Sequence, residues 1–196
     1  MQRSIEIPKA LIYEEFDGHP VYRKGYRDYL VGTKTVEELM GTSKLQWFIV
    51  TAILRKILEL FQPGEYLVGT NEPGVHLKRG TNLANDIAIY RKGQLKIGLN
   101  SINYAEIPPV VAIEVDVQAD CSDIFSNEFE YMEAKSKRLL DFGAQKIIWI
   151  GSVSKKVSII SSDRRWEIID WDLPFEVLDG KYVNVWDLML KNGFEA

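Results

Sequence analysis

Apolar residues recur every three or four positions in two stretches of the chain, which is the spacing of one buried helix face. The first stretch covers 43–61, behind the capping candidates Thr42 and Ser43. The second covers 126–142, and Gly143 follows it where the left-handed C-terminal cap of a helix belongs. The pattern therefore predicts two long helices.

Other stretches are rich in β-branched and aromatic residues and are bounded by turn formers, which predicts strands. The run 108–117 is nearly continuous in apolar residues, as expected of a strand buried on both faces, and we place it at the centre of a sheet. Asp17 and Gly18 supply a turn between the first two predicted strands, which are separate strands or a loose hairpin. The remaining elements are strands at 4–12, 20–31, 65–70, 82–90 and 146–153, a hairpin over 157–170 and a short closing helix over 183–193.

The order of strand 108–117, helix 126–142 and strand 146–153 leaves enough chain for a right-handed parallel crossover. Together with the hairpins, this order predicts an α/β fold in which helices cover a mixed β-sheet. The 196 residues are 46% hydrophobic and 27% charged, which excludes disorder, collagen-like repeats and a disulfide scaffold. We expect a single domain over 1–196.

The cysteine content and the N-terminal sequence bear on the compartment. Cys121 is the only cysteine, so one chain can form neither an internal disulfide nor a Cys-based zinc cluster, which fits a reducing environment. The N-terminal segment has no basic stretch leading into an apolar run, and no part of the chain approaches the roughly 18 apolar residues of a membrane span. We therefore expect a cytoplasmic protein with no membrane partner.

The formal net charge is −4, from 24 Lys and Arg against 28 Asp and Glu. Proteins that depend on phosphate contacts usually carry a basic excess, so this charge disfavours a protein that coats DNA. An enzyme with an acidic site remains compatible, because the site itself adds negative charge. Paired basic residues beside turns are either clamps for a DNA backbone or solvated hairpin tips: Lys78-Arg79, Arg91-Lys92, Lys155-Lys156 and Arg164-Arg165.

Two carboxylates stand inside segments that are otherwise expected to be buried, Asp86 in 82–90 and Glu114 in 108–117. A buried ionised carboxylate is costly unless it is paired, and Mg²⁺ is a partner that accepts two such groups at once. Asp116 follows Glu114 by two residues, so strand alternation places it on the same face and predicts three converging acids. Alternatively, each acid faces solvent or forms an ion pair with a lysine.

Lys135 is the candidate that compensates these negative charges. It lies on the helix after the Glu114 strand, at the border of the predicted buried face, where a long side chain can reach the sheet. A lysine there could stabilise a phosphate or position a water molecule. The alternative is a surface lysine in the basic run that also holds Lys137 and Arg138.

These residues, taken in order, resemble the motifs of the PD-(D/E)XK nuclease superfamily, and more closely its Uma-type branch of bacterial restriction-endonuclease-like proteins. The motifs are an Asp that ends one strand, a Glu in the next strand and a Lys on the following helix. The spacing from Lys135 to Gly143 is the most branch-specific part. The resemblance covers most of the chain, through the segments 13–18, 43–61, 85–90, 113–117, 135–143 and 147–150.

The resemblance implies a restriction-endonuclease-like mixed β-sheet flanked by helices, and an activity that hydrolyses DNA phosphodiester bonds. It implies that Asp86 and Glu114 bind Mg²⁺ or Mn²⁺, with the carbonyl of Val115 as a further ligand. It also implies that Lys135 takes the place of the motif lysine, on the helix in place of the strand.

Two further positions, Glu14 and Gln46, match residues that line the site in such proteins. In this chemistry a divalent cation polarises the phosphoryl oxygen and lowers the pKa of a bound water, while the lysine orients that water or offsets negative charge. A homodimer is expected by resemblance, because the two strands of a duplex must both be cut.

The chain departs from the family pattern at three positions. Asn85 stands where the motif has Pro, Asp116 where a strand Lys or a small polar residue is expected, and Leu139 where an aromatic residue is usual. Asp116 and the acidic net charge motivate an alternative function, a catalytically inactive nuclease-fold protein that binds nucleic acid or a protein partner. A third hypothesis is a metal-dependent hydrolase of small phosphoesters.

Overall fold

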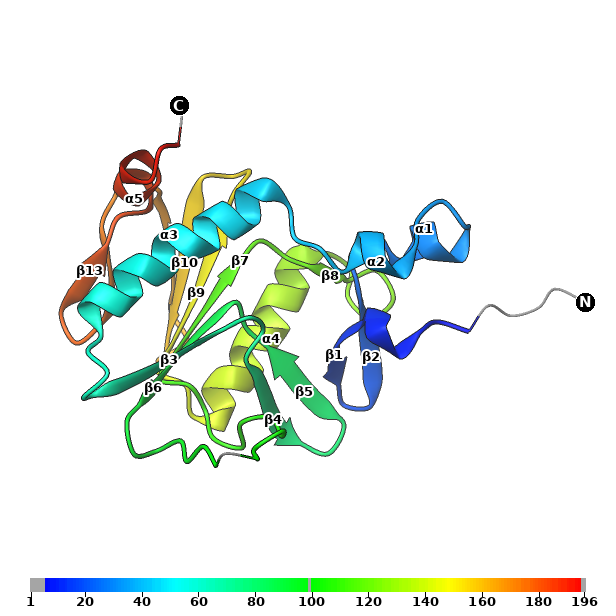
Figure 1. Ribbon diagram of the computed structural model, residues 1–196, viewed down its shortest axis with the longest axis horizontal. Helices are drawn as coiled ribbons and strands as arrows, with labels where there is room; N and C mark the ends of the chain where they lie inside the picture. Colours follow the sequence, from blue (N-terminus) through cyan, green and yellow to red (C-terminus); the bar gives the residue numbers. More distant parts are fainter. Residues whose placement is uncertain (1–5, 99, 195–196) are drawn as a thin grey trace, which may run out of the picture.

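A six-stranded mixed sheet forms the centre of the protein, which we describe from a computed structural model covering residues 6–98 and 100–194 (Figure 1). The innermost pair is parallel, and every other pairing in this sheet is antiparallel. The fold is therefore the predicted mixed α/β class. In spatial order the strands are β11 (Trp166–Asp170), β10 (Lys156–Ser161), β9 (Lys146–Gly151), β7 (Val111–Val115), β6 (Ile87–Arg91) and β3 (Tyr66–Thr70).

The predicted crossover connects the two innermost strands. β7 runs parallel to β9, with Val111 opposite Lys146 and Val115 opposite Ile150, and helix α4 (Glu128–Phe142) connects them. Gly143 ends the helix with a φ of 121°, a backbone conformation that glycine adopts without steric penalty. The crossover, the central position of β7 and the role of Gly143 were all predicted from the sequence.

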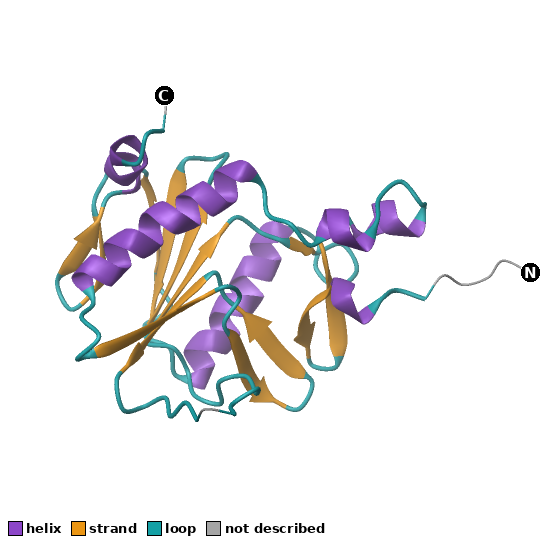
Figure 2. Ribbon diagram, in the orientation of Figure 1, coloured by secondary structure: helices purple, strands orange, loops and turns teal. Residues whose placement is uncertain are grey.

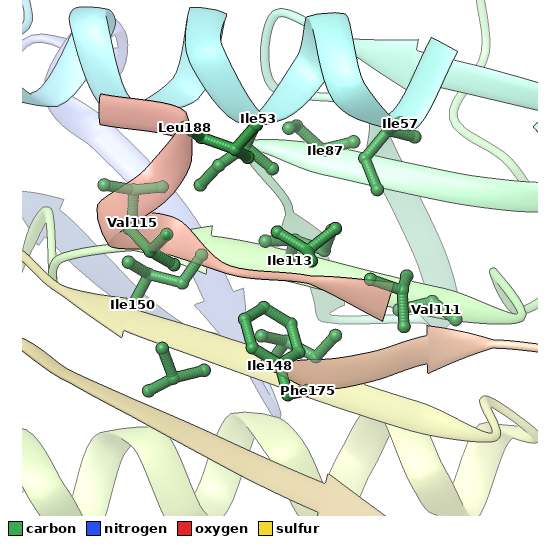
Figure 3. Close-up of a cluster of buried hydrophobic side chains, with 14 of the residues drawn as sticks. Ile53, Ile57, Ile87, Val111, Ile113, Val115, Ile148, Ile150, Phe175 and Leu188 are labelled. Carbon is green, nitrogen blue, oxygen red and sulfur yellow. The ribbon is translucent and has the colours of Figure 1, made fainter. Parts of the chain in front are cut away.

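The alternation of side chains along β7 separates two hydrophobic cores. Val111, Ile113 and Val115 face helix α3 (Lys44–Leu60), together with Ile148 and Ile150 of β9 (Figure 3). Helix α5 (Val185–Lys191) and the hairpin of β12 (Phe175–Leu178) and β13 (Lys181–Val183) complete this core. Ala112, Ile147 and Trp149 face the other way, toward α4. The continuous apolar run 108–117 thus reflects burial on both faces.

A second, antiparallel sheet packs on the far side of α4, so this helix lies between two sheets (Figure 2). Phe16, Val21 and Leu83 of the second sheet share a core with Tyr131 and Leu139 of the helix. In spatial order its strands are β4 (Gly74–Lys78), β5 (Thr81–Ala84), β1 (Ile12–Phe16), β2 (His19–Arg23) and β8 (Ala119–Asp120).

The predicted strand 82–90 is wrong in one respect, because the chain breaks it at Asn85 and Asp86. β5 before the break belongs to the second sheet, and β6 after it belongs to the central sheet. Alternation and β-branching continue across the break, so the sequence pattern did not reveal the change of sheet.

The N-terminal prediction also needs correction. The hairpin around Asp17 and Gly18 is confirmed, but its strands cover only β1 and β2. The second half of the predicted strand 20–31 is helix α1 (Tyr26–Leu30), which follows Gly25. In the predicted strand 4–12, Ser4 and Ile5 lie outside the described residues, and a 3-10 turn (Lys9–Leu11) precedes β1. The short helix α2 (Val36–Leu39) and strands β4, β8, β12 and β13 were not predicted.

Within residues 6–98 and 100–194, no helix is long and apolar enough to cross a bilayer. The expectation of a single domain over 1–196 stays a prediction.

Candidate functional site

The change of sheet at Asp86 brings this residue beside Glu114. β6 and β7 pair antiparallel, with Ile87 opposite Ile113, so the next residues along this register are Asp86 and Glu114. Asp86 is half-buried, whereas Glu114 is 1% exposed on the α4 side of the sheet. The prediction of two carboxylates on neighbouring strands is confirmed for Glu114 in β7, whereas Asp86 lies one residue before the neighbouring strand β6.

Asp86 links the end of β7 to an open cleft. Its Oδ2 accepts a hydrogen bond of 2.7 Å from the backbone N–H of Val115. The cleft has a volume of about 720 Å³, and Asp86 lines it together with Gln46, Arg23 and Glu72. Burial raises the pKa of the Asp86 carboxyl to about 6, although the Val115 hydrogen bond and the Lys135 charge oppose the rise.

Lys135 joins two buried carboxylates from different sheets. Its Nζ lies 2.7 Å from Glu14 Oε1 on β1 and 2.9 Å from Glu114 Oε1 on β7, and it donates to the Ala84 carbonyl at 2.5 Å. The lysine side chain is fully buried. The alternative of a surface lysine is therefore wrong, and the predicted proximity of Lys135 to the acidic pair is confirmed.

Glu14 is the most fully hydrogen-bonded acid of the site. Its Oε1 accepts from the Ala84 N–H at 2.9 Å, and its Oε2 accepts from the Tyr131 hydroxyl at 2.7 Å. Tyr131 also presents its ring to Lys135 Nζ, at 5.9 Å from the ring centroid, and Trp149 does so at 5.5 Å. An ammonium group surrounded by aromatic rings gains cation–π stabilisation where water is excluded.

The protonation of the buried network follows from these contacts. Burial raises the pKa of Glu114 well above its usual value, with Lys135 opposing the rise and Asp86 and Glu14 adding to it. Burial alone lowers the pKa of Lys135, but the carboxylates of Glu114 and Glu14 outweigh it and hold that pKa above its usual value. Lys135 therefore stays charged, and a carboxylate takes up any proton that enters the network.

Gln46 connects helix α3 to the end of β7. Its Nε2 donates to the Val115 carbonyl at 3.2 Å. Its Oε1 is buried and has no hydrogen-bond partner among the described residues. Glu114 Oε1 is also buried, and it has the Lys135 ammonium as an ion-pair partner at 2.9 Å. Buried oxygens without donors are costly in a folded protein unless they have a further partner.

Asp86, Glu114 and the Val115 carbonyl supply oxygens of the chemical kind that binds a hard divalent cation. Asp86, Glu114 and the Val115 carbonyl are oxygen donors, and Mg²⁺ in proteins commonly takes one or two carboxylates and completes its shell with water and phosphate. Among the described residues, no three Asp, Glu, His or Cys side chains form a metal-binding group. A divalent cation held by these oxygens would have to complete its shell with water or with substrate oxygens.

Asp116 does not join the acidic pair in the predicted way. β7 ends at Val115, and Asp116 has a φ of 58°, so strand alternation does not extend to it. Its Oδ1 accepts from the Ser152 N–H at 2.7 Å, which ties it to the end of β9. The expectation of three acids converging on one face is wrong because the strand ends one residue too early.

Two other features bear on the sequence predictions. Sequence reasoning missed Tyr131, although it lies one helical turn before Lys135 and therefore on the same face of α4.

The basic residues beside turns are mostly paired with acids of this chain, which supports solvated hairpin tips over DNA clamps. The pairs are Lys78–Asp17, Arg91–Asp179, Lys156–Asp170, Arg164–Asp141 and Arg165–Asp163.

A solved protein structure has a fold similar to that of this chain. No family model matches the chain, and no curated protein matches it. A crystal structure from Anabaena variabilis ATCC 29413, described as "a putative nuclease belonging to DUF820", superposes with a TM-score of 0.66. The two chains share a fold. The alignment covers 91% of this chain and 90% of that one at 14% sequence identity, so the similarity extends over nearly the whole of both folds.

Proposed function

We propose that this protein is a Mg²⁺- or Mn²⁺-dependent endonuclease that hydrolyses DNA phosphodiester bonds, of the PD-(D/E)XK type and its Uma-type branch. The observation that carries the proposal is the meeting of Asp86, Glu114 and Lys135 at the point where the chain passes between two sheets. The nuclease-like fold supports it.

In this proposal Asp86, Glu114 and the Val115 carbonyl would hold the cation, and the bound cation would polarise the phosphoryl oxygen and lower the pKa of a water molecule. Lys135 supplies fixed positive charge beside the two carboxylates and offsets negative charge that builds up on the phosphate. Glu14 keeps Lys135 in place from the other sheet. Gln46 holds the Val115 carbonyl.

The decisive test is a calorimetric titration of Mn²⁺ and Mg²⁺ into the wild type and the Asp86→Asn variant. We expect the substitution to weaken cation binding by at least about a hundredfold and to abolish cleavage of duplex DNA. Asp116→Asn is the matched control, since its side-chain oxygen can still accept from Ser152 and it should bind as wild type does.

The outcomes of this titration separate the rival functions. Equal Mn²⁺ and Mg²⁺ affinity of Asp86→Asn and wild type would contradict the proposed metal site. Cation binding without DNA affinity, but with turnover of a chromogenic phosphodiester, would indicate a small-phosphoester hydrolase. DNA binding that Asp86→Asn leaves intact, with no cleavage by wild type, would indicate the non-catalytic nuclease-fold protein. The homodimer is a separate expectation, and sedimentation equilibrium measures it directly.

Cation affinity should fall in mild acid. The Asp86 carboxyl, with a pKa of about 6, must lose its proton before it can bind a cation. Mn²⁺ affinity should therefore drop by about fivefold between pH 6 and pH 5, with proton release detectable as buffer-dependent heat. An affinity that stays constant over this range would contradict the assignment of Asp86 as a ligand.

A further inference from the structure

A second charged pair, Arg23 and Glu72, lines the same cleft as Asp86. Arg23 ends strand β2, and Glu72 lies in the turn between β3 and β4. The guanidinium donates from Nη1 to Glu72 Oε1 at 2.9 Å and from Nη2 to Oε2 at 2.7 Å. The carboxylate and the guanidinium thus meet through two parallel hydrogen bonds, the geometry in which arginine also binds a phosphate.

The arginine is held in place and the glutamate is more accessible. The Arg23 side chain is 13% exposed, and its guanidinium lies over the Tyr13 ring at 5.1 Å from the centroid. Its Nε is buried and has no hydrogen-bond partner among the described residues. The Glu72 side chain is 40% exposed, so it can swing into solvent while the arginine stays where it is.

Glu72 also places a negative charge near the acid that is proposed to bind the cation. Its carboxylate contributes to the raised pKa of Asp86. A nucleic acid that enters this cleft would therefore meet an additional repulsive charge, unless Glu72 moved away. An arginine occupied by a carboxylate, beside a site proposed for phosphodiester chemistry, has the features of a phosphate site with an internal competitor.

We propose that Arg23 binds a backbone phosphate of the nucleic-acid substrate, and that the Glu72 carboxylate occupies this phosphate site in the free protein. The substrate class rests on the proposed function, but the phosphate site does not require hydrolysis. Displacement of Glu72 frees the guanidinium and removes one negative charge from the neighbourhood of Asp86. Glu72 thereby weakens the binding of anions that cannot replace both of its hydrogen bonds.

The other cations of the cleft provide a matched comparison. Lys34 also lines it and is paired with Asp28 at 3.0 Å, but both side chains are nearly half exposed. A solvated lysine pair gives little directional binding and is screened by salt. Asp28→Asn therefore removes an equal charge from the partner of a cleft lysine, without freeing a buried guanidinium.

The test measures binding of a short fluorescein-labelled DNA by anisotropy in EDTA, with inorganic phosphate as competitor. We expect Glu72→Gln to tighten binding by about tenfold and Asp28→Asn to change it by less than about twofold. Arg23→Lys should weaken binding by about tenfold, and Glu72→Gln should give no gain in the Arg23→Lys background. Thermal melting of each variant verifies that it is folded.

Four results would overturn the phosphate site. If Asp28→Asn and Glu72→Gln increased DNA affinity equally, the change in net charge alone would explain the effect. A full Glu72→Gln gain in the Arg23→Lys background, or no DNA binding by any variant, would remove Arg23 as the phosphate ligand. In a separate calorimetric titration without EDTA, loss of Mn²⁺ binding in Glu72→Gln would make Glu72 a cation ligand in place of a competitor. Absence of hydrolysis alone affects only the proposed function, because the anisotropy assay contains no divalent cation.

Discussion

Replacing Lys135 with Met should destabilise the fold by about 3–5 kcal/mol, because it removes the cation that lies between the buried carboxylates of Glu14 and Glu114. Glu14 and Glu114 come from different sheets, so their mutual repulsion would act directly across the contact between the sheets. Urea unfolding at neutral pH measures the loss. Met has nearly the volume of the lysine side chain, which keeps a cavity contribution small.

Two variants show whether charge causes this loss. Lys137→Met on the same helix replaces an exposed lysine and should change stability by less than about 0.5 kcal/mol. Adding Glu114→Gln to Lys135→Met removes one of the stranded charges and should restore part of the stability. A loss below about 1 kcal/mol for Lys135→Met, or no rescue by the second substitution, would refute the electrostatic explanation.

The same loss should depend on pH in a defined direction. Without Lys135, burial raises the carboxyl pKa of Glu114 with less opposition than in the wild type. When burial raises the pKa of an acid above its value in the unfolded state, the folded state becomes less stable as the pH rises from the unfolded-state pKa through the folded-state pKa. The reason is that the unfolded state ionises more easily than the folded state over this range. The destabilisation by Lys135→Met should therefore be larger at neutral pH than in acid.

The parts of the site that the sequence predicted correctly depend on regular geometry. An acid in a continuous apolar strand indicated Glu114, because such a strand has no solvent-facing side on which a charge can rest. Helical spacing placed Lys135 beside the buried face of α4, and its long side chain covers the remaining distance to the sheet. Strand and helix periodicity are local properties, so a single sequence contains them.

The parts that the sequence did not predict depend on irregular backbone or on distant partners. Alternation failed at Asp116 because β7 ends before it and the backbone turns into the left-handed region. Arg23 at the end of β2 pairs with Glu72 in the turn between β3 and β4. These residues are far apart in the sequence, so no local pattern indicates their pairing. The break at Asn85 was hidden because the residues on both sides suit strands equally well.

Glu114→Gln should reduce DNA hydrolysis by about a thousandfold while leaving the fold as stable as wild type or more stable. In the proposed function Glu114 holds the cation, so its loss costs several kcal/mol of transition-state stabilisation. The folded protein, however, gains from losing a charge whose burial disfavours ionisation, and Lys135 keeps Glu14 as its partner. Urea unfolding and a plasmid-cleavage assay on the same preparation measure both effects.

Glu14→Gln provides the contrast, because it removes the other carboxylate that neutralises Lys135. The two Glu14 oxygens accept from Ala84 N–H, the Tyr131 hydroxyl and Lys135 Nζ, and an amide would turn one acceptor into a donor facing these groups. We expect a loss of about 2 kcal/mol or more for Glu14→Gln and none for Glu114→Gln. Equal losses would mean that both acids are retained for structure. Opposite effects would mean that Glu14 holds the lysine in place, while the buried Glu114 charge lowers the stability of the fold. Glu114 would then be retained for function and not for stability.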